Sequence, residues 1–312
     1  MKKAWREAFR RGDELCREIE AFQRPAIVLA HHDDEISTAG LLQRLGPRTS
    51  VVWVTNSDGL YYESALNPAE YSEVRKAEGF NSVALLGIPP EGVTNLDHSE
   101  VEIYRRMAWL HSGARTVTDV RPFFQRIRES VRDTLFALRP DAVFTQAWQG
   151  GQPEHDLAHF FTMLAVRDLG RETGTPVPLY HLPAYEYTVA IAFRFHPLYR
   201  GPRLRLRLTP GELALKLRMT EVYASQAKGF ADFRRVFNVV APLGRPFGGP
   251  RTLEELMSVE ELGPVPADLD YTRKPHRFDA FTYMFDDFEG TRVTFRRSVR
   301  PVVQAFLEEG RS

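Results

Sequence analysis

The sequence has very little cysteine, no long apolar run and no excess charge of either sign. Cys16 is the single cysteine among 312 residues, which excludes an internal disulfide framework and fits a reducing compartment. No apolar run approaches the roughly 20 residues that a membrane-spanning helix needs. Lysine plus arginine and aspartate plus glutamate both number 41, so the charge balance predicts binding neither to bulk nucleic acid nor to an anionic membrane.

The first 22 residues also lack the apolar segment and the small-residue cleavage site of a secretory signal. Their apolar side chains recur at helical spacing, which predicts a helix over 1–22 packed on the main body. We therefore expect a cytoplasmic protein whose single domain spans 1–312, with a core over about 24–285. We expect a small-molecule partner rather than a membrane or a nucleic acid, and the composition is compatible with a homo-oligomer.

Apolar runs alternate with helical patterns through the first half of the chain. The runs predict strands at 26–31, 50–56, 83–88 and 141–146. The helical patterns cover 37–45, 68–83, 119–140 and 154–169. Continuous apolar strands that alternate with helices predict an α/β fold, with a Rossmann-like, mostly parallel sheet and helices on both faces. In such sheets the ligand crevice lies beyond the carboxyl ends of the strands.

The C-terminal part is less regular. Strands are predicted at 178–193 and 203–209, and the second alternates basic and apolar residues like an exposed edge strand. A long helix is predicted over 210–230, and the glycine- and proline-rich segment 241–251 is predicted to be a loop.

Two histidines and three acids, residues 31–35, follow directly on the first predicted strand. A single aspartate there would be an ordinary helix cap. Three carboxylates and two imidazoles crowded together would repel one another, so a metal cation is expected to hold them. Histidine favours zinc over magnesium. A magnesium-binding receiver domain is the alternative, but it needs an aspartate after the third strand, and the predicted strand 83–88 has none.

A second histidine cluster follows the fourth predicted strand, in the segment Gly-Gly-Gln-Pro-Glu-His-Asp at 150–156. Alone, His155 and His159 are more typical of a helix start and a half-buried core histidine. Both clusters follow strands of one sheet, however, so we expect them to open onto the same crevice. Two ligands from the first cluster and one from the second would leave an open position, as in catalytic zinc sites.

Together these segments resemble the PIG-L/LmbE-like family of zinc-dependent de-N-acetylases. The sequence Ala-His-His-Asp-Asp-Glu at 30–35 is similar to that family's Ala-His-Pro-Asp-Asp-Glu, and 150–156 is similar to Gly-Gly-His-Pro-Asp-His-Asp. Arg75 with Glu78 resembles its Arg-x-x-Glu segment, and 223–226 resembles its Tyr-x-Ser-Gln. The similarity spans most of 24–285.

The resemblance implies a role for several positions. His31, Asp34 and His155 would be zinc ligands, and Asp33 would be the general base that activates the zinc-bound water for attack on an amide carbonyl. Arg75 would bind the substrate through a sugar hydroxyl or a charged substituent. The alternative for Arg75 is an ordinary solvated helix arginine.

Two positions depart from the family pattern. His32 replaces a proline and is expected either to support the site or to face solvent. Gln152, a candidate catalytic residue, replaces a histidine. A glutamine amide donates a hydrogen bond to an oxyanion but cannot deliver a proton. The proton for the leaving amine then returns from Asp33, or comes from His32 or His159, or activity is reduced or lost. Glu154 keeps the family's carboxylate and is expected to support a ligand or cap the helix.

These observations predict a zinc-dependent amidohydrolase that removes an N-acyl group, with acetyl as the first expectation, from an amino sugar or glycoconjugate. The tyrosine-rich segment 57–71 is predicted to be a substrate lid. One alternative is an amidase that acts on another small amide conjugate. The other, motivated by Gln152, is a metal-containing sugar-binding protein that has lost turnover.

Overall fold

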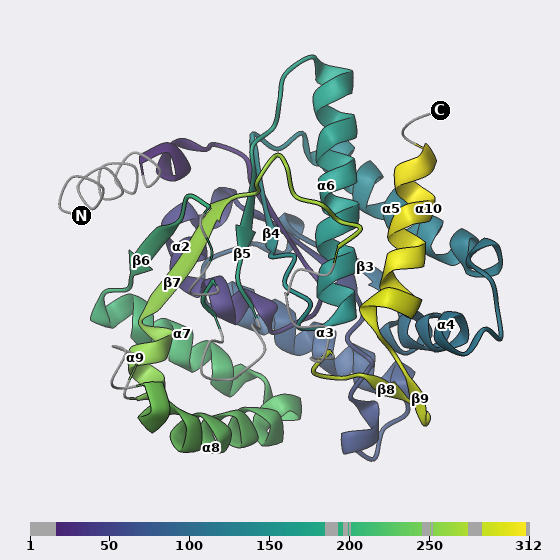
Figure 1. Cartoon of the computed structure of the whole chain (residues 1–312). Coiled ribbons are helices and arrows are strands. Elements are labelled where there is room, and N and C mark those ends of the chain that lie inside the picture. Colours follow the sequence, from purple (N-terminus) through teal and green to yellow (C-terminus); the bar gives the residue numbers. More distant parts are fainter. Residues whose placement is uncertain are drawn as a thin grey trace.

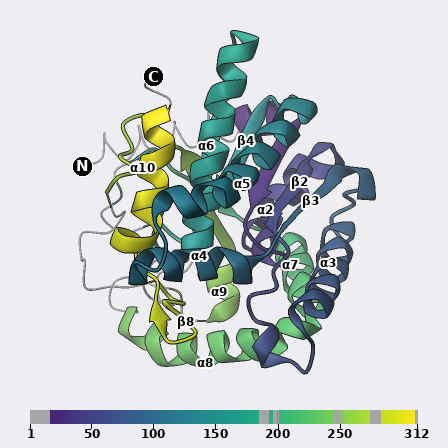
Figure 2. The same cartoon turned by 90° about the vertical axis from the view of Figure 1, so that its right-hand side faces the viewer.

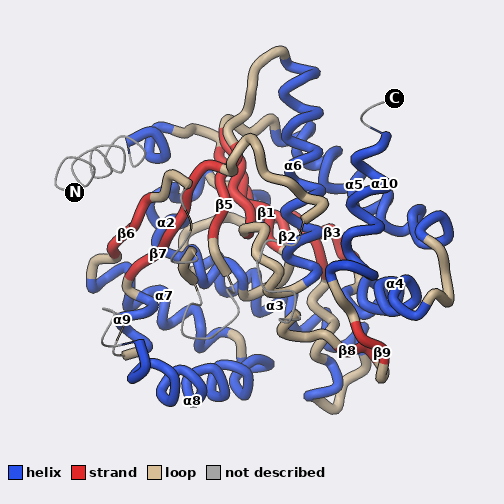
Figure 3. The backbone as a smooth tube through the Cα atoms, viewed as in Figure 1, coloured by secondary structure: helices blue, strands red, loops and turns tan. Residues whose placement is uncertain are grey.

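A seven-stranded sheet, in the order β3-β2-β1-β4-β5-β7-β6, runs through the centre of the described chain (Figures 1 and 3). The computed structural model describes residues 17–184, 193–195, 199, 201–244, 250, 252–273 and 283–309. The five parallel strands are β1 Pro25–Leu29, β2 Ser50–Thr55, β3 Val93–His98, β4 Ala142–Gln146 and β5 Leu179–Leu182. The order 3-2-1-4-5 is that of a doubly wound sheet, so the predicted fold class is confirmed.

Two further strands extend this sheet in antiparallel fashion, and two more form a separate hairpin. β7 Val259–Pro264 pairs with β5, and β6 Leu204–Arg207 pairs with β7 at the edge of the sheet. The short strands β8 Asp287–Phe288 and β9 Thr291–Arg292 pair with each other. Along β6 apolar residues are buried and arginines are exposed, as expected for a charged edge strand.

Helices cover both faces of the sheet. On one face, α2 Ala39–Leu45, α3 Pro68–Ala84 and α7 Pro210–Val222 pack over Ile27 and Leu29 of β1. On the other, Ala26 and Val28 pack against four helices, namely α4 Glu100–Ser112, α5 Val117–Leu138, α6 Pro153–Thr173 and α10 Arg300–Glu309. Figure 2 shows α5, α6 and α10 side by side. β1 is buried on both faces, which explains its uninterrupted apolar sequence.

The remaining helices, α8 Ala227–Gly244 and α9 Leu253–Met257, lie close to each other (Figure 1). α8 crosses the bottom of the molecule in Figures 1 and 2. Within the described ranges, no helix combines the length and the apolar character that crossing a bilayer requires.

The third predicted strand, 83–88, is wrong. α3 continues to Ala84 and the chain then turns through Gly87, which has a φ of +74°. Val83, Leu86 and Ile88 are buried as the end of this helix packs on the sheet. The true third strand is β3, and α4 follows it in a stretch for which no element was predicted. A four-residue apolar run does not by itself distinguish a strand from a buried helix end.

Other boundaries also differ from the prediction. The helix predicted over 210–230 breaks at Tyr223 into α7 and α8, and residues 241–244 of the predicted loop belong to α8. Residues 245–249 of that loop and 185–192 of the predicted strand 178–193 lie outside the described residues. So do residues 1–16 of the predicted N-terminal helix. Residues 17–21 are helical, and Phe22 contacts the rings of Phe144 and Tyr180.

Candidate active site and metal centre

The two histidine clusters meet because their strands are neighbours. β1 and β4 pair in parallel, with Ala26 opposite Val143, so their carboxyl ends open at the same edge of the sheet. The chain leaves β1 into a short 3-10 helix, Asp34–Thr38, and leaves β4 through a turn into α6. Asp156 holds that turn by accepting hydrogen bonds from the backbone amides of Gln149 (3.2 Å) and Gly150 (3.0 Å).

His31, Asp34 and His155 converge at this edge, and all three are buried. His31 Nδ1 lies 3.0 Å from His155 Nε2 and 3.4 Å from Asp34 Oδ2, and His155 Nε2 lies 3.4 Å from Asp34 Oδ1. Tetrahedral zinc with ligand bonds of about 2.0–2.1 Å separates its ligand atoms by about 3.3 Å. The spacing and the donor set of two nitrogens and one oxygen therefore fit a zinc ion.

The charges around this cluster also favour a cation. Burial alone would raise the pKa of the Asp34 carboxyl, but His155 and His31 hold that pKa well below its usual range. Asp34 is therefore an anion at neutral pH, and it also accepts a hydrogen bond from the His31 backbone amide (2.7 Å). The structure thus brings together the three residues whose role as metal ligands is predicted.

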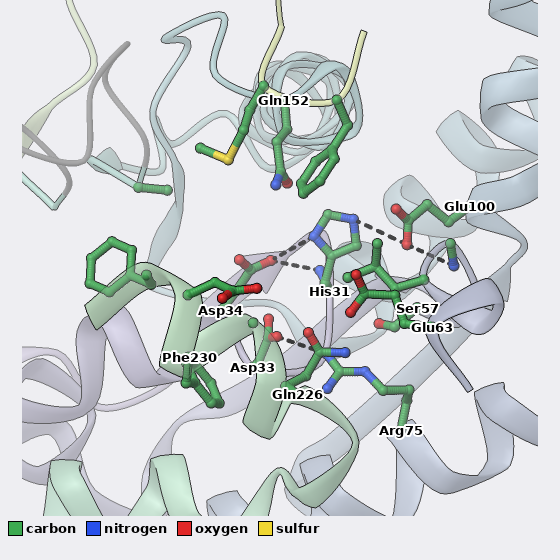
Figure 4. A pocket seen from close by; sticks show the side chains of 18 of the residues that line it. His31, Asp33, Asp34, Ser57, Glu63, Arg75, Glu100, Gln152, Gln226 and Phe230 are labelled. Atoms are coloured by element: carbon green, nitrogen blue, oxygen red, sulfur yellow. Dashed lines mark hydrogen bonds and ion pairs between the residues drawn. The ribbon is translucent and has the colours of Figure 1, made fainter. Parts of the chain in front are cut away.

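Asp33 lies beside this cluster and lines the same pocket. Its φ of +102° is unusual for a residue other than glycine. Its carboxylate accepts a hydrogen bond from Arg75 Nη2 at 2.8 Å (Figure 4), and burial raises the pKa of that carboxyl although Arg75 opposes the rise. A raised pKa suits a group that first accepts and then returns a proton.

Arg75 is buried, so the solvated-arginine alternative is wrong. Besides Asp33, its guanidinium donates to the backbone carbonyl of His32 and lies over the ring of Tyr223 at 5.0 Å. Glu78, one turn further along α3, accepts hydrogen bonds from the amide (2.8 Å) and the hydroxyl (2.5 Å) of Ser225. Arg75 still lines the pocket, and its contacts position Asp33.

Glu35, the last acid of the run, points away from the ligands. It accepts hydrogen bonds from Ser82 Oγ (2.6 Å), Tyr223 Oη (2.5 Å) and the Asp33 backbone amide (3.0 Å). Burial raises the pKa of this carboxyl to about 7. Glu35 therefore fixes the turn that carries Asp33, rather than forming part of the pocket.

His32 and His159 are both fully buried, so the expectation that His32 could face solvent is wrong. His32 uses Nδ1 with Ser57 Oγ (2.9 Å) and Nε2 with Asn95 Oδ1 (2.7 Å), and burial lowers its pKa to about 3. His159 uses Nδ1 with the Gln146 carbonyl (2.6 Å) and Nε2 with Tyr271 Oη (2.9 Å), and burial lowers its pKa to about 4. Neither lines the pocket, so neither is placed to deliver a proton there.

The far side of His31 faces two carboxylates. Its Nε2 lies 3.3 Å from Glu154 Oε1 and 3.6 Å from Glu100 Oε2. Burial raises the pKa of Glu100 to about 7. Glu154 thus supports a predicted ligand, whereas Glu100 was missed because it begins α4, which was not predicted. The Ser-x-x-Glu sequence at 99–102 is a helix-start pattern that could have revealed this helix.

Gln152 is the N-cap residue of α6 and lines the pocket across from His31 (Figure 4). Its Oε1 is buried and has no hydrogen-bond partner among the described residues. An unpaired buried amide oxygen costs free energy unless a ligand satisfies it. The side chain therefore stands ready to contact whatever enters the pocket.

Comparison with known proteins agrees with this geometry. Residues 26–166 match the family model described as PIG-L, GlcNAc-PI de-N-acetylase. This chain carries a PIG-L domain. Both histidine clusters lie within it, as do β1 to β4, so the resemblance noted in the sequence is confirmed. No curated protein matches the chain significantly.

The similarity to solved structures extends beyond the PIG-L domain at 26–166. A deacetylase of the teicoplanin biosynthesis pathway has a TM-score of 0.57 at 16% identity, with 78% of this chain and 99% of that chain covered. N,N'-diacetylchitobiose deacetylase from Pyrococcus horikoshii has a TM-score of 0.51 at 16% identity and coverages of 80% and 85%. The A40926 pseudoaglycone deacetylase has a TM-score of 0.51 at 19% identity, with 78% of this chain and 96% of that chain covered. At identities this low, the structural similarity establishes a shared fold and nothing further.

The pocket above the candidate metal centre has a volume of about 840 Å³, at the upper end of the range for small-molecule sites. The PIG-L domain forms one part of it, including Tyr61, Tyr62 and Glu63 from the segment predicted to be a lid. The later segments, around α7, α8, α9 and β8, form the rest. The predicted lid segment thus borders the pocket, and its closure over a substrate stays a prediction.

Proposed function

We propose that this protein is a zinc-dependent hydrolase that removes an N-acyl group from an amino sugar or glycoconjugate. The observation that carries the proposal is the convergence of His31, Asp34 and His155, whose ligand atoms lie within 4.8 Å of one another beside Asp33. The description of the matching family model and those of the three solved structures named above, each a deacetylase, support this chemistry.

His31, Asp34 and His155 would hold the metal ion. Zinc in such a site supplies Lewis-acid chemistry, which polarises an amide carbonyl and acidifies water. Glu154 and Glu100 would orient the His31 ring by accepting the hydrogen of Nε2.

Asp33 would act as the general base and then as the general acid. Its carboxylate would accept a proton from the attacking water, and burial, by raising its pKa, favours keeping that proton until the amine leaves. Arg75 holds the carboxylate in place through the 2.8 Å contact. By this route the leaving amine receives its proton from Asp33, without a histidine at position 152.

Gln152 would stabilise the developing oxyanion by donating from its side-chain amide. Its position across the pocket from His31 suits that role (Figure 4). Because neither His32 nor His159 lines the pocket, we assign both proton transfers to Asp33.

The first test measures zinc content and acetate release from N-acetylglucosamine-type substrates for wild type and Asp33→Asn. We expect the variant to bind zinc and to lose activity by at least 10²-fold, since a positioned acid–base group contributes about 10²–10⁴-fold. Turnover that survives the substitution would reject Asp33 as the base. Bound metal with no turnover on any N-acyl compound would favour a sugar-binding protein instead.

A further inference from the structure

The pocket has two chemically different walls, one on each side of the candidate metal centre. Ser57, Glu63 and Glu100 lie on one side, beyond His31 (Figure 4). Phe230 lies on the other side of His31, the side on which Figure 4 also shows Asp33 and Asp34. Ser57, Glu63 and Glu100, which we call the polar wall, offer hydroxyl and carboxylate groups, whereas Phe230 on the opposite, apolar wall offers hydrocarbon.

The apolar wall is built by residues that lie outside the PIG-L domain at 26–166. It comprises Phe193, Phe230, Phe233, Val236, Leu253 and Met257, mainly from α8 and α9. The matched family model does not cover these segments, so the apolar wall is a feature of this chain's own C-terminal part.

This wall is supported by a small core of its own. The rings of Phe193 and Phe233 lie 5.9 Å apart, and both pack against the buried cluster of Phe237, Ala241 and Leu256. Val236 remains 43% exposed. Two charged residues of α8, Asp232 and Arg234, also line the pocket. Asp232 forms an ion pair with Arg235 at 3.3 Å, which offsets its charge.

We propose that the apolar wall binds the acyl chain of an N-acyl amino sugar, and that this chain is longer than acetyl. The inference rests on the proposed function. Water adds to the amide carbonyl carbon, the carbon–nitrogen bond breaks, the nitrogen takes a proton, and the acyl group leaves as a carboxylic acid. With the carbonyl at the metal centre, the sugar hydroxyls face the polar wall and the chain extends along the apolar wall.

The position of the apolar wall favours an acyl chain over an apolar group elsewhere on the sugar. An acyl chain starts at the carbonyl carbon, and Phe230 lines the same pocket as Asp33 and Asp34, on their side of His31 in Figure 4. An alkyl group on the anomeric oxygen would instead start from the sugar carbon next to the one that bears the nitrogen, on the sugar side of the amide, so it would not continue from the carbonyl carbon. Burying the chain against the phenylalanine rings would remove apolar surface of both from water.

The test compares hydrolysis of glucosamine carrying N-acetyl, N-butanoyl, N-hexanoyl or N-octanoyl groups. We expect kcat/KM to increase with chain length, by up to about fourfold per buried methylene. The Phe233→Ala variant should lower the octanoyl-to-acetyl ratio at least fivefold. Val239→Ser is the matched control, because Val239 is an exposed apolar residue of the same helix that does not line the pocket, and it should keep the ratio. Thermal unfolding of both variants checks that they are folded.

Equal rates across the series would overturn the acyl assignment. So would a gain that appears only when an octyl group is placed on the anomeric oxygen of N-acetylglucosamine. If no compound is hydrolysed, the proposed function fails, and titration calorimetry then tests whether the apolar wall binds an acyl chain.

Tighter binding of N-octanoylglucosamine than of N-acetylglucosamine, with the difference reduced in Phe233→Ala, supports an acyl site. Equal binding of the two sugars, or binding of the protein to phosphatidylcholine vesicles, overturns it.

Discussion

His31 has polar partners on both nitrogens of its ring. Nδ1 faces His155 and Asp34, while Nε2 faces Glu154 and Glu100. Burial alone would lower the pKa of His31, but Glu100 and the other carboxylates raise it well above the usual value. Carboxylates that accept from the outer nitrogen of a metal-binding histidine set its tautomer and ring orientation.

The Glu154→Gln substitution is expected to weaken zinc binding by about 10- to 100-fold, because an outer partner of a ligand histidine typically contributes that much. Zinc affinity is measured by competition with a chromogenic chelator. Glu221→Gln is the control, since Glu221 is an exposed carboxylate on α7, and it should leave the affinity unchanged. Equal affinities for wild type and Glu154→Gln would mean that Glu154 does not orient the ring.

Among the elements, α2, α7 and β7 are joined by one buried ion pair. Lys216 Nζ lies 2.7 Å from Glu260 Oε1 and also donates to the Ser37 carbonyl at 3.1 Å. Glu260 accepts from the backbone amides of Gly40 (2.8 Å) and Leu41 (2.9 Å) at the start of α2. This carboxylate therefore satisfies amides that the first turn of the helix leaves free. It also connects the C-terminal part to the segment that carries Asp34.

Glu260→Gln is expected to lower the free energy of unfolding by about 3 kcal/mol, because it leaves the buried Lys216 without its countercharge. Burial already lowers the pKa of Lys216, although Glu260 opposes the change. Urea unfolding measures the loss. Combining Glu260→Gln with Lys216→Met should cost less than the sum of the two single changes. Strict additivity would show that the two side chains do not interact.

At the scale of the whole molecule, three buried histidines are held neutral inside the described structure. Burial lowers the pKa of His32 to about 3, of His159 to about 4 and of His181 to about 3. In the unfolded chain each would titrate near 6.5. Below that pH the unfolded state binds more protons than the folded state, so stability decreases as the pH falls from about 6.5 towards 4.

The His159→Gln variant is expected to reduce this pH dependence by about 1.4 kcal/mol per pH unit between pH 6 and 4.5. Glutamine can still hydrogen-bond but does not titrate. The free energy of unfolding is measured by urea titration at several pH values for both proteins. Parallel curves for variant and wild type would show that His159 does not contribute to the acid sensitivity.

Local patterns in the sequence were enough to predict the elements whose structure depends on residues nearby in the chain. Continuous apolar runs predicted β1, β2 and β4, and the acids and histidines after β1 and β4 predicted a shared metal site. This worked because parallel strands place their carboxyl ends together irrespective of the length of chain between them. The particular ligand set of His31, Asp34 and His155 was implied by the family resemblance. The 83–88 run failed as a strand because four apolar residues fit either a strand or a buried helix end.

The sequence by itself determined the doubly wound sheet and the edge at which a metal site could form, since both follow from periodicity and from residues at strand ends. The tertiary structure alone decided which side chains surround that site. Glu100 comes from α4, Arg75 turns inward to hold Asp33, and His32 is buried on Trp53. The apolar wall from α8 and α9 likewise depends on packing between distant segments. Such contacts depend on how helices dock on the sheet, and no short stretch of sequence encodes that.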